Sequence, residues 1–317
     1  MPLRRSSLST PSLATALAVH AAEEAGAPCL IIKGLVSDAH GLRPARVSAD
    51  VDLLVSPGSQ GKVREVLEKF GWSERPASAV ARALISHSWT FSHPRWDVDI
   101  DLHWRFPGML IDDNSAFNNL HARQVELEFA GRSIPCANRP SSILIGALHA
   151  LRSPGQSPRH EREFLYLRDD VVPSLSAAEQ EQLVALARDL GALDTVRPVL
   201  QGSPIELPSP TPWGVDPALD RWRERVATSV PRHTVLRHAF AEMSPMERIL
   251  FLVRAVVGNG THRASDRAPA AFAGAEAPRS FARRTVAGLS GIAGIFRARR
   301  WARQHWRNLM PPGWSGQ

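Results

Sequence analysis

The stretch Ala49–Val55, which reads ADVDLLV, decides the fold of this 317-residue chain. Its apolar run from Val51 to Val55 is typical of a strand, and residues two apart on a strand point to the same side of the sheet. We therefore expect Val51 to face the core, while Asp50 and Asp52 point together to the opposite side. Two carboxylates placed in this way can chelate one divalent cation between them.

A second stretch, Trp96–Trp104 (WDVDIDLHW), shows the clearest apolar–polar alternation in the chain. We expect it to form a strand and to pair in a hairpin with a strand over residues 87–93, across a turn at Pro94. One face of the strand then carries only polar side chains, namely Asp97, Asp99, Asp101 and His103. Aspartate is disfavoured in strands, so such a face requires either solvent or a compensating cation. For Asp97 alone we expect simple exposure.

The remaining pattern predicts a small mixed sheet followed by helices, an α/β fold of the α+β kind. Around the two acidic strands, the apolar spacing predicts a helix over 12–26, a strand over 29–32, helical turns over 35–41 and a helix over 60–70. Beyond Arg139 the pattern becomes helical, with helices expected over 141–151, 161–171, 177–190, 219–228 and 234–257.

The expected domain boundaries follow from this change of pattern. Residues 1–137 should form the sheet-containing domain, and residues 138–265 a helical domain interrupted by a proline-rich linker at 201–217. Residues 266–317 should form a flexible linker rich in alanine and proline, followed by a basic tail.

Positive charge is concentrated in that tail. The formal net charge is +7, and residues 277–317 hold eight arginines and no acidic residue, so residues 1–276 carry 7 − 8 = −1. A nearly neutral body argues against a broad nucleic-acid-binding surface on the globular part. The segment 281–307 mixes arginine with tryptophan and leaves three alternatives open: weak contact with an anionic membrane surface, weak contact with nucleic acid, or a disordered tail.

The cysteine content and the hydropathy favour the cytoplasm. Cys29 and Cys136 are too few and too far apart for a disulfide framework, which is the expected pattern in a reducing compartment. No apolar run reaches the length of about 18 residues that a spanning helix needs. The stretch 6–19 is rich in alanine and broken by polar residues, so it lacks the apolar core of a signal peptide.

Several short motifs, taken in order, resemble one family. They are Leu30–Gly34 (LIIKG), Arg46, Ala49–Val55, Phe70–Trp72 (FGW) and Ile100–Trp104 (IDLHW). With them the chain resembles the uncharacterised nucleotidyltransferases, in the polymerase-beta-like nucleotidyltransferase superfamily, over roughly residues 13–250. The resemblance implies a small mixed-sheet nucleotidyltransferase domain that uses Mg²⁺ or Mn²⁺ and a nucleoside triphosphate (NTP), with ATP binding expected.

The resemblance also implies roles for the carboxylates. Asp50, Asp52 and Asp101 match the metal-binding and catalytic positions of the family motifs. Asp99 shares a face with Asp101 and remains an alternative for the third carboxylate. We prefer Asp101 because it lies in the IDLHW motif.

Four further residues are candidates for nucleotide binding. Lys33 and Gly34 stand where the wider superfamily has a Gly-Gly or Gly-Ser turn near the triphosphate; Lys33 would supply charge, and Gly34 would let backbone amides approach phosphate. Arg46 is a candidate for phosphate contact or an ordinary loop arginine. His103 either contacts substrate or forms a hydrogen bond with a neighbouring aspartate. His149 is either a buried core histidine or a residue that supports the site.

The reaction expected from these residues transfers a nucleoside monophosphate from an NTP to the hydroxyl of an unidentified acceptor, with release of pyrophosphate and Asp101 as the general base. Two alternatives remain. A D-x-D glycosyltransferase is disfavoured because only about 20 residues separate the first expected strand from Asp50. A non-catalytic binding or regulatory module with the same fold is disfavoured because Asp50, Asp52 and Asp101 are all present.

Overall fold

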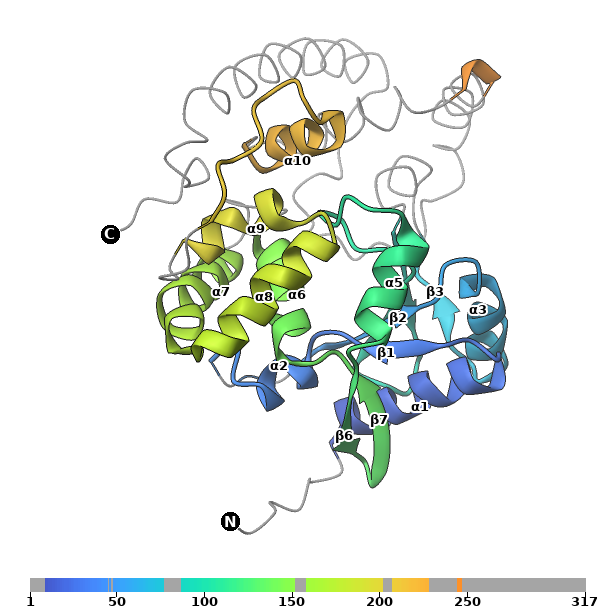
Figure 1. The fold of residues 1–317 in the computed structure, drawn as a ribbon. Coiled ribbons are helices and arrows are strands. Elements are labelled where there is room, and N and C mark those ends of the chain that lie inside the picture. The colour runs from blue at the N-terminus through green and yellow to red at the C-terminus, as the bar shows by residue number, and fades with distance from the viewer. Residues whose placement is uncertain are drawn as a thin grey trace, which may run out of the picture.

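The computed structural model of the chain describes residues 9–44, 46, 48–76, 87–151, 158–201, 207–227 and 244–246. A mixed sheet and a group of helices lie side by side in it (Figure 1). The predicted α/β fold with a helical region after the sheet is therefore confirmed.

The sheet has seven strands in the order β3-β4-β5-β2-β1-β7-β6. Their bounds are β1 Cys29–Ile31, β2 Asp50–Val55, β3 Ser73–Glu74, β4 Ser88–Ser92, β5 Asp99–His103, β6 Val125–Phe129 and β7 Arg132–Cys136. The two acidic strands, β2 and β5, are direct neighbours and run parallel. The strand β1 pairs antiparallel with β2, and β4 pairs antiparallel with β5.

The predicted hairpin of the second acidic stretch is confirmed, but its second strand is shorter than expected. The strand β5 begins at Asp99, and Trp96 lies before it, with its backbone N–H donating to the carbonyl of His93. Trp96 packs against Trp72, with ring centroids 5.7 Å apart, which fixes the chain in a turn at this point. Asp97 therefore does not share the polar face of the strand; it is exposed, as we expected for this residue alone.

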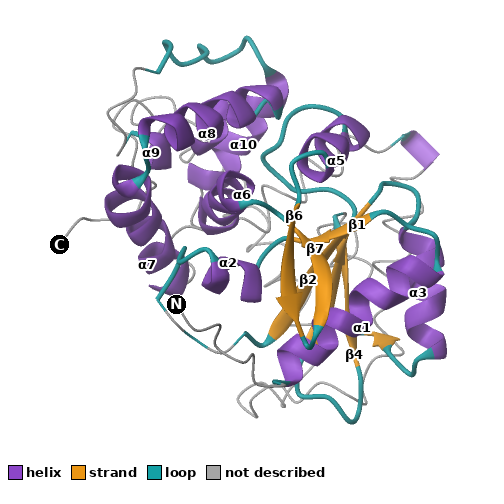
Figure 2. Ribbon diagram, turned by 60° about the horizontal axis from the view of Figure 1, so that its bottom comes forward, coloured by secondary structure: helices purple, strands orange, loops and turns teal. Residues whose placement is uncertain are grey.

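One face of the sheet is covered by α1 (Thr10–Glu24) and α3 (Gln60–Lys69) (Figure 2). Ser9 caps α1 by accepting a hydrogen bond from the backbone of Ser12, and Pro11 lies in the first turn, where its missing N–H costs nothing. The apolar residues of both helices join those of the central strands in one core. Both helices were predicted within two residues of their ends.

The other face of the sheet meets the helical region, which contains α2 (Leu35–Ala39), α5 (Asp113–His121), α6 (Arg139–Leu151), α7 (Pro158–Tyr166), α8 (Ala177–Asp189), α9 (Leu193–Leu200) and α10 (Pro217–Ala227). The helix predicted over 161–171 is present, but it begins earlier, at Pro158, and its last turn, Leu167–Val171, is π-helical. A short 3-10 helix, Val172–Ser174, follows it. The core on this side joins Leu30, Ile32 and Leu54 of the sheet with the helices.

The described part of the proline-rich segment, residues 207–216, contains neither helix nor strand. It is held to the helical region at Thr211, whose backbone N–H donates to Asp194 and whose carbonyl accepts from Arg223. The helix predicted over 234–257, the linker 266–280 and the basic segment 281–307 lie outside the described residues, apart from 244–246.

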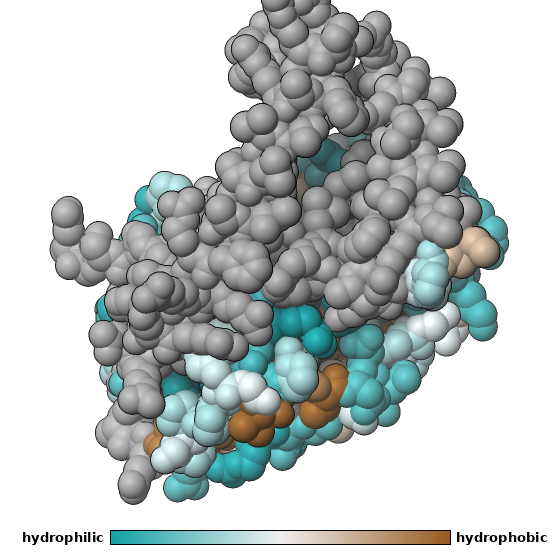
Figure 3. Space-filling model, turned by 90° about the horizontal axis from the view of Figure 1, so that it is seen from above, coloured by the Kyte–Doolittle hydropathy of each residue, from teal (hydrophilic) through white to brown (hydrophobic). Residues whose placement is uncertain are grey.

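In the view from above, the visible described residues are mainly hydrophilic, with a few hydrophobic ones among them (Figure 3). The large exposed hydrophobic side chains of the described residues, Leu13, Val215 and Met246, belong to separate segments. Within the described residues, no helix combines the length and the apolar character that a membrane span requires.

Candidate active site

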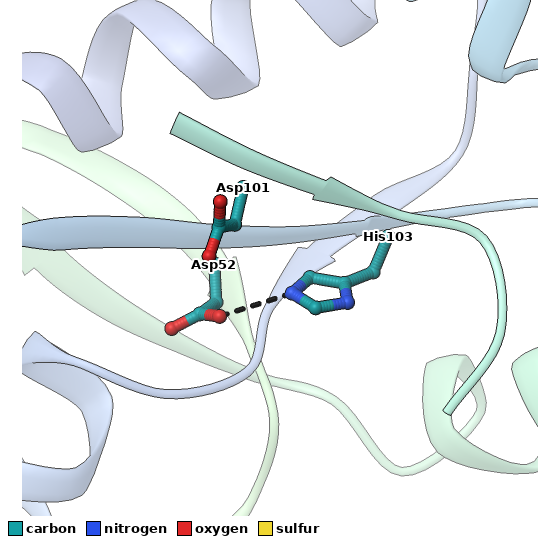
Figure 4. A group of neighbouring side chains, drawn as sticks. All are labelled: Asp52, Asp101 and His103. Carbon is teal, nitrogen blue, oxygen red and sulfur yellow. Dashed lines mark hydrogen bonds and ion pairs between the residues drawn. The ribbon is translucent and has the colours of Figure 1, made fainter. Parts of the chain in front are cut away.

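The acidic residues meet where β2 and β5 run parallel. The register pairs Asp50 with Asp99 and Asp52 with Asp101. Asp52, Asp101 and His103 come together from the two strands, with one potential ligand atom of each within 4.8 Å of the others (Figure 4). These three residues, the acidic cluster, form the only such group found among the described residues.

Asp52 is the most deeply buried member, with an exposed fraction of 1%. Its Oδ1 lies 2.6 Å from Lys33 Nζ and 3.0 Å from His103 Nε2. Burial alone would raise the pKa of this carboxyl group, but the charge of Lys33 and the hydrogen bond from His103 together hold the pKa below its ordinary value. Asp52 is therefore ionised in the folded protein.

His103 is buried between the strands and the helical region. Its Nε2 donates to Asp52, while no described residue forms a hydrogen bond with its buried Nδ1. Because the carboxylate of Asp52 can only accept, Nε2 carries the proton of this hydrogen bond. Of the two roles open for His103 in the sequence, the structure shows the hydrogen bond to an aspartate neighbour.

Asp99 and Asp101 lie on the same strand but have different partners. Asp101 accepts a hydrogen bond of 2.6 Å from the hydroxyl of Thr90 on β4. Asp99 is held by Arg75, with 2.6 Å between Arg75 Nη2 and Asp99 Oδ2. Asp101 is thus close to Asp52 and His103, whereas Asp99 is neutralised by an arginine at the start of the strand, which supports Asp101 as the third carboxylate.

The carboxyl group of Asp50 differs from its neighbours in having no hydrogen bond or ion pair with any described residue. Burial first, and then the negative charge of Asp52, raise its pKa. Asp50 lines the same pocket as Asp52 but does not belong to the acidic cluster. Chelation of one cation by both residues of the D-x-D motif therefore stays a prediction.

A pocket opens between the ends of the strands and the helices α6 and α7. It is open to solvent, and its empty volume, part of which is open solvent, is about 510 Å³. On the sheet side it is lined by Lys33, Gly34, Ser37, Leu42, Arg43, Arg46, Asp50 and Asp52. On the helical side it is lined by Ser142, Gly146, His149, Arg159, Glu163 and Leu167. The sequence-based candidates Lys33, Gly34 and Arg46 thus lie together with the D-x-D motif.

Arg46 contacts the helical side of the pocket. Its Nη2 lies 3.2 Å from Glu163 Oε1, and Arg159 Nε lies 3.0 Å from the same oxygen. Burial first, and then the charges of Arg43 and Arg159, lower the pKa of Arg46. Arg43, Arg159 and Glu163 were not singled out from the sequence, because an Arg/Glu pair four residues apart is ordinary on a helix.

Gly34 is required by the close approach of its backbone to β2. Its φ is +64°, and a Cβ added there would lie 3.3 Å from the carbonyl oxygen of Asp50. A side chain at this position would therefore be strained and would push against the D-x-D strand. The glycine of the LIIKG motif has a structural reason that the sequence alone did not reveal.

His149 connects the helical region to the site, since its Nδ1 lies 3.4 Å from Lys33 Nζ. His149 is thus linked to Asp52 through Lys33.

The donor set at the cluster fits a divalent cation. His103 Nε2 is engaged by Asp52, and the other two members of the cluster, Asp52 and Asp101, offer carboxylate oxygens. Carboxylate oxygen and water are the ligands that suit Mg²⁺ and Mn²⁺, whereas imidazole nitrogen favours other metals.

The mixed sheet places Asp52 of β2 beside Asp101 of β5, and Asp52 also lines the pocket. Residues 13–200 match the model of a family described as uncharacterised nucleotidyltransferase. The chain therefore belongs to this family, as the motifs in its sequence indicated.

Solved structures give distant matches. An antibiotic-resistance factor, ANT(2'')-Ia, studied in solution, matches with 18% identity and a TM-score of 0.37, over 58% of this chain and 92% of its own. A crystal structure of ANT(2'')-Ia in complex with adenylyl-2''-tobramycin gives 16% and 0.35, over 61% and 98%. An antigenic nucleotidyltransferase-like protein from Paracoccidioides brasiliensis gives 14% and 0.36, over 62% and 94%. Among curated proteins, none matches this chain.

Proposed function

We propose that this protein is a metal-dependent nucleotidyltransferase that moves a nucleoside monophosphate from an NTP to the hydroxyl of an acceptor and releases pyrophosphate. The observation that carries the proposal is the position of Asp52 and Asp101, side by side on parallel strands next to a pocket lined with basic residues. Family membership supports the enzyme class. It also favours this reaction over that of a D-x-D glycosyltransferase.

The charges around the pocket suit a polyphosphate. Lys33, Arg43, Arg46 and Arg159 line it together with Asp50, Asp52 and Glu163. A divalent cation, when bound, neutralises phosphate oxygens and polarises the reacting phosphorus. In our proposal Asp50, Asp52 and Asp101 hold that cation.

The basic residues take separate roles in the proposal. Lys33 keeps Asp52 in place and adds positive charge to the floor of the pocket, 2.6 Å from the carboxylate. Gly34 lets the backbone approach phosphate, and Arg46 contacts phosphate from the rim. His103 holds the same oxygen of Asp52 as Lys33 does, so its part in nucleotide binding is indirect.

Asp101 would take the proton from the acceptor hydroxyl. The acceptor oxygen then forms a bond to the α-phosphorus, and the bond between this phosphorus and the pyrophosphate oxygen breaks. Positioning and charge neutralisation supply most of the rate in such phosphoryl transfers.

A metal-free binding module is the second candidate, and one observation favours it. The ion pair between Lys33 and Asp52 already balances the most buried carboxylate without any cation. Such a module would bind nucleotides equally well after removal of metal.

Calorimetric titration with each of the four NTPs distinguishes the two candidates. We expect the wild type to bind an NTP with Mg²⁺ or Mn²⁺ but not with EDTA, and Asp50→Asn/Asp52→Asn to lose this binding. Asp97→Asn is the matched control, because Asp97 is an exposed aspartate just before β5. Binding that persists in EDTA would favour the binding module, and no binding of any NTP would contradict both.

A further inference from the structure

The two carboxylates of the acidic cluster are held in the same way. Asp52 Oδ1 lies 2.6 Å from Lys33 Nζ and 3.0 Å from His103 Nε2. Asp101 accepts a hydrogen bond from Thr90, also through Oδ1. In the described part of the chain, no other donor reaches either carboxylate. Asp101 thus has Oδ1 bound by Thr90, while its Oδ2 has no donor among the described residues.

Thr90 is well placed to fix Asp101. It lies on β4 directly opposite Asp101 in the antiparallel pair, where side chains of the two strands are neighbours. Its Oγ1 lies 2.6 Å from Asp101 Oδ1, a length typical of a hydrogen bond to a charged oxygen. Threonine is branched at Cβ and has few rotamers in a strand, so the hydroxyl is held in position before any ligand arrives.

We propose that Thr90 is a positioning residue, whose hydroxyl fixes the rotation of the Asp101 carboxylate and thereby presents Oδ2 to the cation and to the proton of the acceptor. The inference rests on the proposed function, since it concerns the same site. A carboxylate that rotates freely would lose part of its affinity for a cation, because its orientation would have to be fixed on binding.

The experiment measures Mn²⁺ binding without nucleotide, by electron paramagnetic resonance of the free ion, in the full chain. Thr90→Val removes the hydroxyl but keeps the shape and the preference for a strand. Thr90→Ser restores a hydroxyl. Ser92→Ala is the matched control, because it removes a hydroxyl on the same face of β4, at a position paired with Ser73.

We expect Thr90→Val to raise the Kd for Mn²⁺ about ten- to a hundredfold, as is typical when a partner of a metal ligand is lost. Thr90→Ser should restore the affinity, Ser92→Ala should leave it unchanged, and the Tm of Thr90→Val should stay at that of the wild type. In an Asp101→Asn background, Thr90→Val should have no further effect on the Kd, which ties the change to this pair.

The inference is overturned if Thr90→Val binds Mn²⁺ as the wild type does, or if Thr90→Ser is as weak as Thr90→Val. An equally large rise in the Kd for Mn²⁺ in Ser92→Ala would also overturn it. The loss of affinity would then follow from removing any hydroxyl on this face of β4, and not from Thr90 in particular. A wild type that binds no Mn²⁺ is a different result, since it removes the metal site of the proposed function and the role of Thr90 with it.

Discussion

The eleven residues of β2 and β5 form the two faces of one strand pair, and these faces are stabilised by different kinds of interaction. On the face toward α1 and α3, the side chains are apolar and at most 3% exposed; they are Val51, Leu53, Val55, Ile100 and Leu102. On the opposite face the two strands begin with Asp50, Asp52, Asp99 and Asp101, and His103 and Leu54 follow.

The difference shows which substitutions each face tolerates. The apolar face is held by burial, which has no preferred direction and accepts small changes of volume. The polar face is held by directional contacts, such as those of Asp52 with Lys33 and His103, and the loss of one partner leaves the other unsatisfied. Substitutions on the two faces should therefore have different effects on the stability of the fold and on ligand binding.

The largest effect is expected for Lys33→Met, which keeps the length of the side chain but leaves Asp52 as a buried charge. Removal of one partner of a buried ion pair costs about 3–5 kcal/mol of folding free energy. Urea unfolding measures the change at neutral pH. The double variant Lys33→Met/Asp52→Asn should recover much of it, since no unpaired charge remains. A loss below about 1 kcal/mol would show that His103 alone satisfies Asp52.

The pH dependence of this loss has a definite sign. Lys33 and His103 outweigh burial and hold the pKa of Asp52 below its ordinary value of 3.8. A carboxyl group with a lowered pKa stabilises the fold above its unfolded pKa, and that contribution is lost as the pH falls through the folded pKa. The difference between wild type and Lys33→Met should thus be complete at neutral pH and shrink below about pH 4.

Ile100→Val tests the apolar face with a smaller effect. Ile100 is fully buried next to Asp99 and Asp101 in sequence, and loss of one methylene there should cost about 0.5–1.5 kcal/mol in urea unfolding. The affinity for Mn²⁺ and NTP should not change, because the side chain points away from the pocket. A clear loss of affinity would mean that a change on the apolar face alters the site on the polar face, so the contrast between the two faces would not hold.

The sequence predicted the parts of the fold that carry a regular pattern. The apolar run of the first acidic stretch predicted β2, and the alternation of the second predicted β5 and the hairpin with β4. Helical spacing predicted α1, α3, α6 and α8. The sequence did not show that β2 and β5 are parallel neighbours, because register and strand order depend on the packing of the whole sheet. That pairing is what brings Asp101 beside Asp52.

The rest of the site could not be predicted from spacing. Thr90 binds Asp101 and Arg75 binds Asp99, and these partners distinguish the two aspartates. Neither partner lies in a recognisable motif. Thr90 reaches Asp101 only because β4 pairs with β5, and Arg75 lies in the loop before β4. The hairpin of β6 and β7 was not predicted either. In β6 the apolar residues Val125, Leu127 and Phe129 do alternate with glutamates, so a period-two signal was present there and was missed. The partner strand β7 reads RSIPC and carries no such alternation.

The smallest change in stability is expected for Asp50→Asn, and it contrasts most sharply with Lys33→Met. The carboxyl group of Asp50 has no partner among the described residues, and burial and the charge of Asp52 raise its pKa. A raised pKa means that the charged form is disfavoured in the folded state, so the carboxyl group lowers stability at neutral pH and this cost disappears as the pH falls. Asparagine removes the charge and keeps the shape.

We therefore expect Asp50→Asn to leave the free energy of unfolding unchanged or to raise it by less than about 1 kcal/mol. The same variant should lose metal-dependent NTP binding in calorimetry, since a residue kept at a cost in stability is typical of a functional site. Unfolding in urea at pH 7 and the titration with Mn²⁺ and NTP are measured on the same preparation. A destabilised variant with full affinity would reverse the assignment and make Asp50 a structural residue of the strand end.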